Sequence, residues 1–225
     1  ILNKLGFDWS QHLHHLSYGM VDLPSGKMKS REGTVVDGDE LISEMKLNAT
    51  ELSKELGKIE EFTTYEKEEL NSTIGLGALK YFILKVDPKK RILFDPNESI
   101  DFNGNTGPFI QYAYARIQSL IIKSKFSLTK INLDFEITQK EKNILKQLTQ
   151  FPVAIKAAGD NYSPALIANF TFELVKLFNS YYQSTTILKV NDIEIKNFRL
   201  TLSSKVGEVI KSSMKLLGVS VPNKM

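Results

Sequence analysis

The stretch SPALIANFTFELVKLFNSY, residues 163–181, decides the fold class of this chain. Its large apolar side chains recur every three or four residues, which is the spacing of one face of an α-helix. Ser163 followed by Pro164 is a typical helix start, because proline fits the first helical position. A helix with such an apolar face has to pack against other helices. The apolar positions are Leu166, Ile167, Phe170, Leu174, Leu177, Phe178 and Tyr181.

Further helices are indicated on both sides of this stretch. Thr63 with Glu66, and Thr138 with Glu141, have the spacing of capping boxes and predict two helix starts. Asp39 is expected to cap an earlier helix, and residues 190–193 are expected to lie in a loop before the last one. The expected helices cover about residues 39–56, 63–82, 108–123, 138–148, 163–181 and 198–217.

The remaining segments are punctuated by glycine and proline, which indicates strands and loops. Residues 1–36 are expected to be short strands and loops, and residues 92–94 with 100–102 a short extended excursion or hairpin. The sequence therefore predicts a mainly α chain, in which a helical bundle follows a small α/β piece.

The composition is that of a globular protein without disulfides or thiolate metal sites. Of the 225 residues, 42% are hydrophobic, 24% are charged and none is cysteine. No apolar run reaches the roughly 20 residues of a membrane helix, and the lack of cysteine fits a cytoplasmic protein. The three histidines, His12, His14 and His15, lie in one stretch without a second ligand cluster, so we predict no metal site.

A basic loop is expected near the start of the chain. Lys27, Lys29 and Arg31 fall within five residues, between Gly26 and Gly33. A loop of this kind binds a polyphosphate through side-chain cations and backbone N–H groups together. A solvated basic loop is the alternative.

The helix expected after residue 108 has the side chains of an RNA-binding surface. It carries Gln111, Tyr112, Tyr114 and Arg116, and unpaired bases are read by stacking on aromatic rings and by hydrogen bonds to their edges. Tyr112 and Arg116 share one face and Gln111 and Tyr114 another, so both faces cannot contact RNA equally. A purely packing role for Tyr112 is the alternative. Residues 80–130 hold nine basic and four acidic side chains, which also favours a phosphate backbone as partner.

Three segments and the chain end together resemble the arginyl-tRNA synthetases. The segments are LSYGMV (16–21), GKMKSREGTVV (26–36) and SIDFNGNTGPFIQYAYAR (99–116), and the end is LLGV (216–219) followed by Pro222 and Met225. The resemblance covers essentially the whole chain in order, as the C-terminal portion of such an enzyme.

The resemblance implies a class I aminoacyl-tRNA synthetase, which activates arginine with ATP and Mg²⁺ and transfers it to tRNA-Arg. It implies that residues 1–60 are the end of a Rossmann-type catalytic domain and residues 61–225 a helical anticodon-binding domain. The HIGH motif of the family is absent from this sequence. We therefore expect the chain alone to be a cytoplasmic monomer that binds tRNA weakly, holds no ATP or Mg²⁺ tightly and catalyses nothing.

By the same resemblance, the basic loop corresponds to the KMSKS loop, which closes over the ATP phosphates. Lys27 and Met28 match that motif, whereas Lys29, Ser30 and Arg31 depart from it. Ser30 stands where the second lysine of the motif belongs, so Lys29, Arg31 or a lysine outside this chain has to supply that charge.

The resemblance also places His15 and Met20 beside the adenine of ATP, with a surface or core position as the alternative for His15. It assigns anticodon contacts to Gln111, Tyr112, Tyr114 and Arg116, and to Met225, for which a frayed end is the alternative. Two other functions stay open: a stand-alone RNA-binding module without catalysis, and an ATP-binding enzyme unrelated to tRNA.

Overall fold

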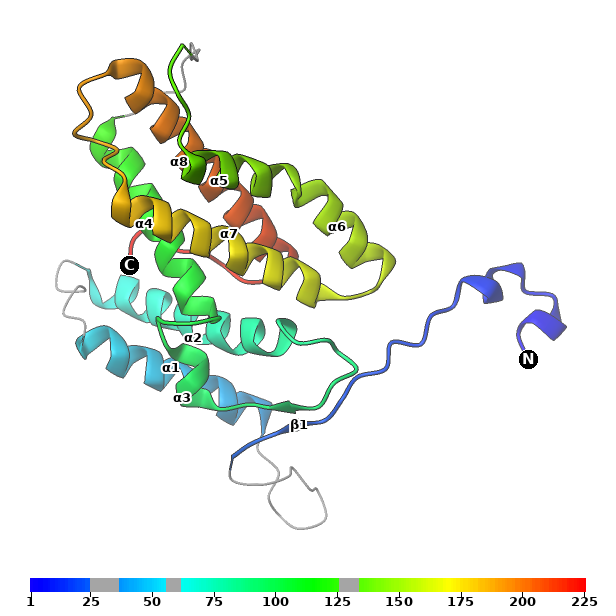
Figure 1. The fold of residues 1–225 in the computed structure, drawn as a ribbon. Coiled ribbons are helices and arrows are strands. Elements are labelled where there is room, and N and C mark those ends of the chain that lie inside the picture. The colour runs from blue at the N-terminus through cyan, green and yellow to red at the C-terminus, as the bar shows by residue number, and fades with distance from the viewer. Residues whose placement is uncertain (25–36, 56–61, 126–133) are drawn as a thin grey trace.

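The computed structural model describes residues 1–24, 37–55, 62–125 and 134–225, and Figure 1 shows their arrangement. Two 3₁₀ turns open the chain, two short strands lie apart in sequence, and the rest of the regular structure is helical. The elements are η1 (Asn3–Leu5), η2 (Asp8–His12), β1 (Val21–Asp22), α1 (Gly38–Glu55), α2 (Thr64–Leu84), β2 (Ile92–Leu93), α3 (Pro96–Ile100), α4 (Gly107–Ser124), α5 (Gln139–Thr149), α6 (Phe151–Asp160), α7 (Pro164–Ser184) and α8 (Ile193–Leu216).

The helices pack in two groups, each around its own hydrophobic cluster (Figure 1). The larger cluster lies among α4, α5, α7 and α8 and includes Ile117 and Phe178, which are fully buried. The smaller cluster lies among α1, α2, β2 and α3 and includes Met45 and Phe94. Tyr81 of α2 belongs to the larger cluster, so α2 joins the two groups. The prediction of a mainly α chain is confirmed, whereas the expected domain boundary at residue 60 stays a prediction.

The two predicted capping boxes are present and start α2 and α5. The Glu66 carboxylate accepts the Thr63 N–H at 2.8 Å, and the Thr63 hydroxyl accepts the Glu66 N–H at 3.3 Å. Helix α1, in contrast, is capped two residues earlier than expected. Asp37 caps it by accepting the Asp39 N–H at 2.8 Å, and Asp39 itself lies inside the helix.

Three further elements differ from the prediction. Residues 96–100 form helix α3 rather than part of a hairpin, because the Asp95 carboxylate accepts N–H groups of Asn97 and Glu98. Helix α8 begins at Ile193 rather than near residue 198, because Asp192 caps it in the same way. Helix α6 was not predicted, since it is short and two of its three large apolar side chains, Val153 and Ile155, are exposed.

The two strands pair in parallel, with Val21 opposite Ile92. An ion pair between Arg91 and Asp22 fixes this pairing, and Arg91 Nη2 lies 2.9 Å from Asp22 Oδ1. The hydrogen bond and the negative charge of Asp22 raise the pKa of the Arg91 guanidinium. Strand β1, which precedes the basic loop in sequence, is therefore held against the segment between α2 and α3.

A close helix crossing holds α1 against α2. A methyl group added at Gly75 would lie 2.6 Å from the carbonyl oxygen of Met45, so only glycine fits there. Among the described helices, none combines the length and the apolar character that a bilayer crossing requires.

Candidate functional site

Arg116 projects from α4 between two aromatic rings. Its guanidinium carbon lies 4.8 Å from the centre of the Tyr112 ring and 5.1 Å from that of Tyr182. Its Nη1 donates a hydrogen bond to Asn179 Oδ1 at 3.1 Å. Tyr112 stands one helical turn before Arg116, and the other two residues come from the adjacent helix α7. These contacts hold the cation in one orientation while its side chain and both rings stay partly exposed.

A groove of about 380 Å³ opens beside this cluster. Its lining includes two tyrosines, one arginine, one lysine and one methionine. Aromatic faces bind nucleobases by stacking, and neighbouring cations bind the phosphate backbone. The groove therefore has the chemistry to hold unpaired nucleotides. Its lining residues are Tyr112, Ala115, Arg116, Ser119, Leu120, Lys123, Tyr182, Leu188 and Met225.

Tyr182 and Asn179 were not selected from the sequence. Both belong to α7, and only the packing of α7 on α4 brings them to Arg116. The sequence did contain a signal for Tyr182. Tyr181 is the last position of the apolar face of this helix, so the adjacent Tyr182 has to lie beside that face, nearer the solvent. In the structure Tyr181 is fully buried and Tyr182 is half-buried.

Gln111 and Tyr114 lie on the inner face of α4, which corrects their expected role as direct base contacts. Gln111 has no exposed surface, and its Nε2 donates to the carbonyl oxygens of Thr73 at 3.0 Å and Ser220 at 2.8 Å. Tyr114 is 3% exposed, and its hydroxyl lies 3.3 Å from Asn223 Oδ1. Both side chains hold the chain after α8 in place. Their burial leaves Tyr112 and Arg116 as the exposed pair.

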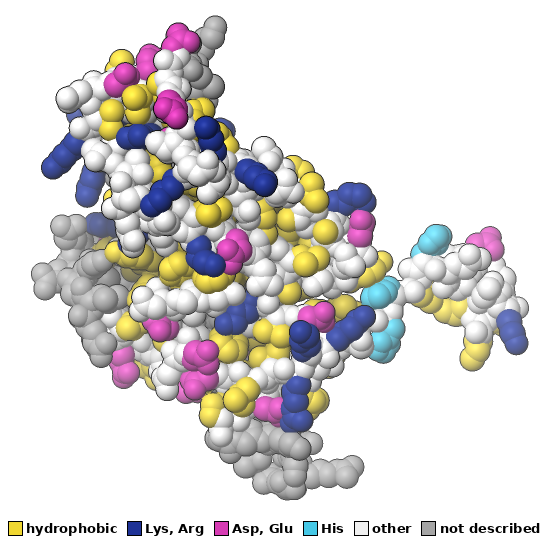
Figure 2. Space-filling view, viewed as in Figure 1, with side chains coloured by type: hydrophobic (Ala, Val, Ile, Leu, Met, Phe, Trp, Pro, Cys, Tyr) yellow, Lys and Arg dark blue, Asp and Glu magenta, His cyan; other side chains and the backbone are white. Residues whose placement is uncertain are grey.

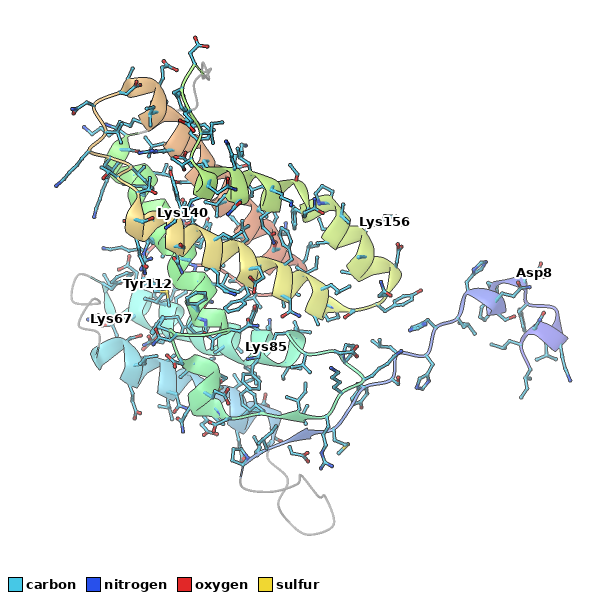
Figure 3. The ribbon with its side chains drawn as sticks, in the orientation of Figure 1. Asp8, Lys67, Lys85, Tyr112, Lys140 and Lys156 are labelled. Atoms are coloured by element: carbon cyan, nitrogen blue, oxygen red, sulfur yellow. The ribbon has the colours of Figure 1, made fainter. Side chains whose placement is uncertain are left out.

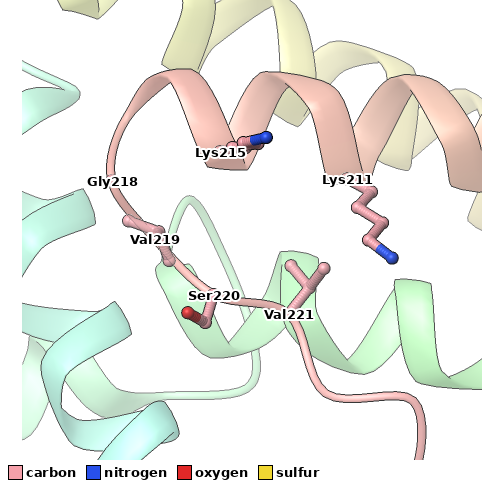
Figure 4. Close-up of a pocket in the computed structure, with 6 residues that line it drawn as sticks. All are labelled: Lys211, Lys215, Gly218, Val219, Ser220 and Val221. Carbon is pink, nitrogen blue, oxygen red and sulfur yellow. The ribbon is translucent and has the colours of Figure 1, made fainter.

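The residues after α8, here called the tail (residues 217–225), run back across α4. Figure 4 shows the tail leaving α8 at Gly218 and continuing through Ser220 and Val221, beside the lysines Lys211 and Lys215. Lys80 Nζ donates to the Gly218 carbonyl oxygen at 2.9 Å.

Both hydrophobic clusters hold the tail. Val219 and Val221 pack on the larger cluster, and Met225 packs on the smaller one. Met225 is thus placed at the groove rather than frayed.

The segment before β1 carries the two residues expected beside adenine. His15 is exposed and lies outside any helix or hydrophobic cluster, and the Met20 side chain is also exposed. The Met20 carbonyl oxygen accepts the Ile92 N–H at 2.9 Å, so that group is engaged in strand pairing. His15 and Met20 lie in one segment without regular secondary structure, and both side chains are accessible.

The basic loop itself, with Lys27, Met28, Lys29, Ser30 and Arg31, lies outside the described residues. Within the described part of the chain, no group of three histidine, aspartate or glutamate side chains is arranged to hold a metal ion.

Comparison with known proteins identifies both halves of the chain. Residues 110–225 match the family model described as DALR anticodon binding domain, and residues 1–95 match that of the tRNA synthetases class I (R), catalytic domain. The arginine–tRNA ligases of Flavobacterium psychrophilum and Parabacteroides distasonis are 56% and 52% identical to this chain over its full length. The chain spans only 37% and 38% of those two proteins.

The solved structures give the same result. The Thermus thermophilus arginyl-tRNA synthetase matches the whole chain with a TM-score of 0.90 and 27% identity, over 38% of its own length. The Plasmodium falciparum enzyme, at 23% identity and a TM-score of 0.77, shares the fold over 39% of its length. This chain therefore belongs to the arginyl-tRNA synthetase family, with the class I catalytic domain model matching its first part and a DALR anticodon-binding domain forming its second.

Proposed function

We propose that this chain is the part of an arginine–tRNA ligase that binds the anticodon of tRNA-Arg and supplies the loop over the ATP phosphates. One observation carries the proposal: Arg116 is held between Tyr112 and Tyr182 in a groove of the anticodon-binding domain. An anticodon base stacks on the exposed ring of Tyr112 or Tyr182, and Arg116 meets the base edge or its phosphate. Met225 packs against the base from the tail.

In the complete enzyme, the substrates are arginine, ATP and tRNA-Arg. Negative charge builds up on the α-phosphate and pyrophosphate during activation, and positioned cations lower the energy of that state. Lys27, Lys29 and Arg31 supply these cations, whereas Ser30 offers only a hydroxyl. Mg²⁺ would accompany the ATP phosphates in the complete enzyme. His15 and Met20 border the adenine.

The test of anticodon binding is a titration of this chain with tRNA-Arg transcripts at fixed salt. We expect weak, salt-dependent binding that weakens further when anticodon bases are changed. Arg116→Ala should weaken binding by about tenfold, since stacking and cation contacts contribute roughly 1–3 kcal/mol per base. Lys156→Ala is the matched control, because it removes one cation from α6, far from Tyr112 and the groove (Figure 3). Equal binding of all transcripts would contradict the assignment.

The catalytic part of the proposal has a separate test. We expect no arginine-dependent ATP–pyrophosphate exchange from this chain alone and robust exchange from the longer protein that contains it. A longer protein that binds tRNA-Arg but shows no exchange would favour a stand-alone RNA-binding module. We further propose that the chain acts as a cytoplasmic monomer, which sedimentation at several protein concentrations would test.

A further inference from the structure

An aromatic stack joins the segment before β1 to the far end of the helical bundle. The His14 and Tyr162 rings lie 4.0 Å apart between centroids and are inclined by only 11°. His14 lies within the match to the catalytic domain model, and Tyr162, in the turn between α6 and α7, lies within the match to the anticodon-binding model. Figure 2 shows histidine side chains gathered where the N-terminal arm meets the body. The stack is thus a side-chain contact between the two parts of the chain.

The backbone of Tyr162 indicates that its ring has a role. Its φ of 51° lies in the left-handed region, where glycine or asparagine is usual at the end of a helix. Its N–H donates to the Gly159 carbonyl oxygen at 3.2 Å. The next N–H, from Ser163, donates to the Ala158 carbonyl oxygen at 3.0 Å. Tyrosine is strained in this turn, yet 54% of the residue is exposed, so burial in the core does not explain it. The stacking partner of the ring is His14.

The other end of the same segment is fixed to the turn between α2 and β2. The Gly19 N–H donates to the Pro88 carbonyl oxygen at 2.7 Å. A methyl group at Gly19 would lie 2.1 Å from the Lys90 carbonyl oxygen, so the two backbones are in direct contact. Between the two anchors lies a hollow of about 280 Å³ that also includes Leu16 and Asp87. His15 therefore lies in a segment held at both ends, with Met20 directly after the second anchor.

We infer that Tyr162 is a positioning residue for the nucleotide site, acting through His14 on the segment that carries His15 and Met20. The inference rests on the proposed function. The Tyr162 ring fixes one end of this segment, and the Gly19 contact fixes the other. The two contacts hold this segment against the helical body, which keeps His15 and Met20 in place for the nucleotide.

The stack is tested first on this chain, by NMR of the histidine ring protons. In the wild type, the His14 protons should be shifted by the ring current of Tyr162. Tyr162→Phe should preserve that shift, and Tyr162→Gly should abolish it. Because glycine suits the left-handed turn, Tyr162→Gly should not lower the melting temperature. Unchanged His14 shifts in Tyr162→Gly would overturn the inference.

The positioning role is tested on the longer ligase by ATP–pyrophosphate exchange. Tyr162→Gly should raise the KM for ATP by up to about tenfold, which is the contribution of one aromatic pair, and Tyr162→Phe should restore the wild-type value. An unchanged KM in an active Tyr162→Gly enzyme overturns the positioning role alone. Absence of exchange in the wild-type ligase overturns the proposed function, while the NMR result still reports on the stack.

Discussion

Gln111→Met should release the tail from the bundle. The substitution keeps the length of an unbranched side chain but removes the two hydrogen bonds to Thr73 and Ser220. Two neutral hydrogen bonds contribute about 2 kcal/mol in total. Leaving the Ser220 carbonyl without its donor increases the loss of stability by about 1 kcal/mol. The substitution also removes the buried Gln111 Oε1, which has no partner among the described residues, and this decreases the loss by a similar amount. The net loss is about 2 kcal/mol.

Two measurements check this loss. A loss of about 2 kcal/mol should lower the melting temperature by roughly 4–8 °C for a chain of this size. If the loss falls on the tail alone, carboxypeptidase should release Met225 about 30-fold faster, because cleavage follows the population of the open tail. Gln118→Met, on the same helix and half-buried, is the matched control and should change stability by less than about 0.5 kcal/mol. Equal melting and equal cleavage in both variants would refute the role of Gln111.

Three further outcomes are expected. Gly75→Ala should destabilise the chain by about 1–3 kcal/mol in urea denaturation, because its methyl group would clash with a backbone carbonyl of α1. Gly159→Ala is the control: its methyl group meets nothing within 4 Å, so this substitution should stabilise the chain by about 0.5–1 kcal/mol. Arg199→Leu should cost about 3–5 kcal/mol, because it leaves the buried carboxylate of Glu141 without its ion pair; a loss below about 1 kcal/mol would contradict this. The capping hydrogen bonds lower the pKa of Glu66, so its stabilising effect is complete above the unfolded-state pKa and is lost as the pH falls through the lower folded pKa. The melting temperatures of the wild type and Glu66→Gln should therefore converge in acid, and a constant difference would refute this.

The sequence predicted those features that depend on neighbouring residues. The capping boxes at Thr63 and Thr138 were found because both partners of each box lie within one turn of a helix. Asp37 was missed in favour of Asp39, since two nearby aspartates have equal cap propensity and only the helix register decides between them. Helix α6 was missed because its apolar residues are divided between the bundle and solvent.

The candidate site was predicted only in part, because its geometry depends on contacts between distant segments. Tyr112 and Arg116 share a face by helical spacing, and the structure confirms that they meet. Helical spacing alone left open which face of α4 is covered. That was decided by the tail, which engages Gln111 and Tyr114, and by α7, which brings Tyr182 to the groove. No local pattern encodes these three contacts.

The tail has a consequence for how the protein folds. Its contacts join residues far apart in sequence: Gly218 to Lys80 across 138 positions, and Ser220 to Gln111 across 109. Closing such long loops is entropically unfavourable until the intervening helices are compact, so long-range contacts form late. The groove, which needs Met225, should consequently become competent for RNA only in the last kinetic step of folding, after the helices have reached their native helical content.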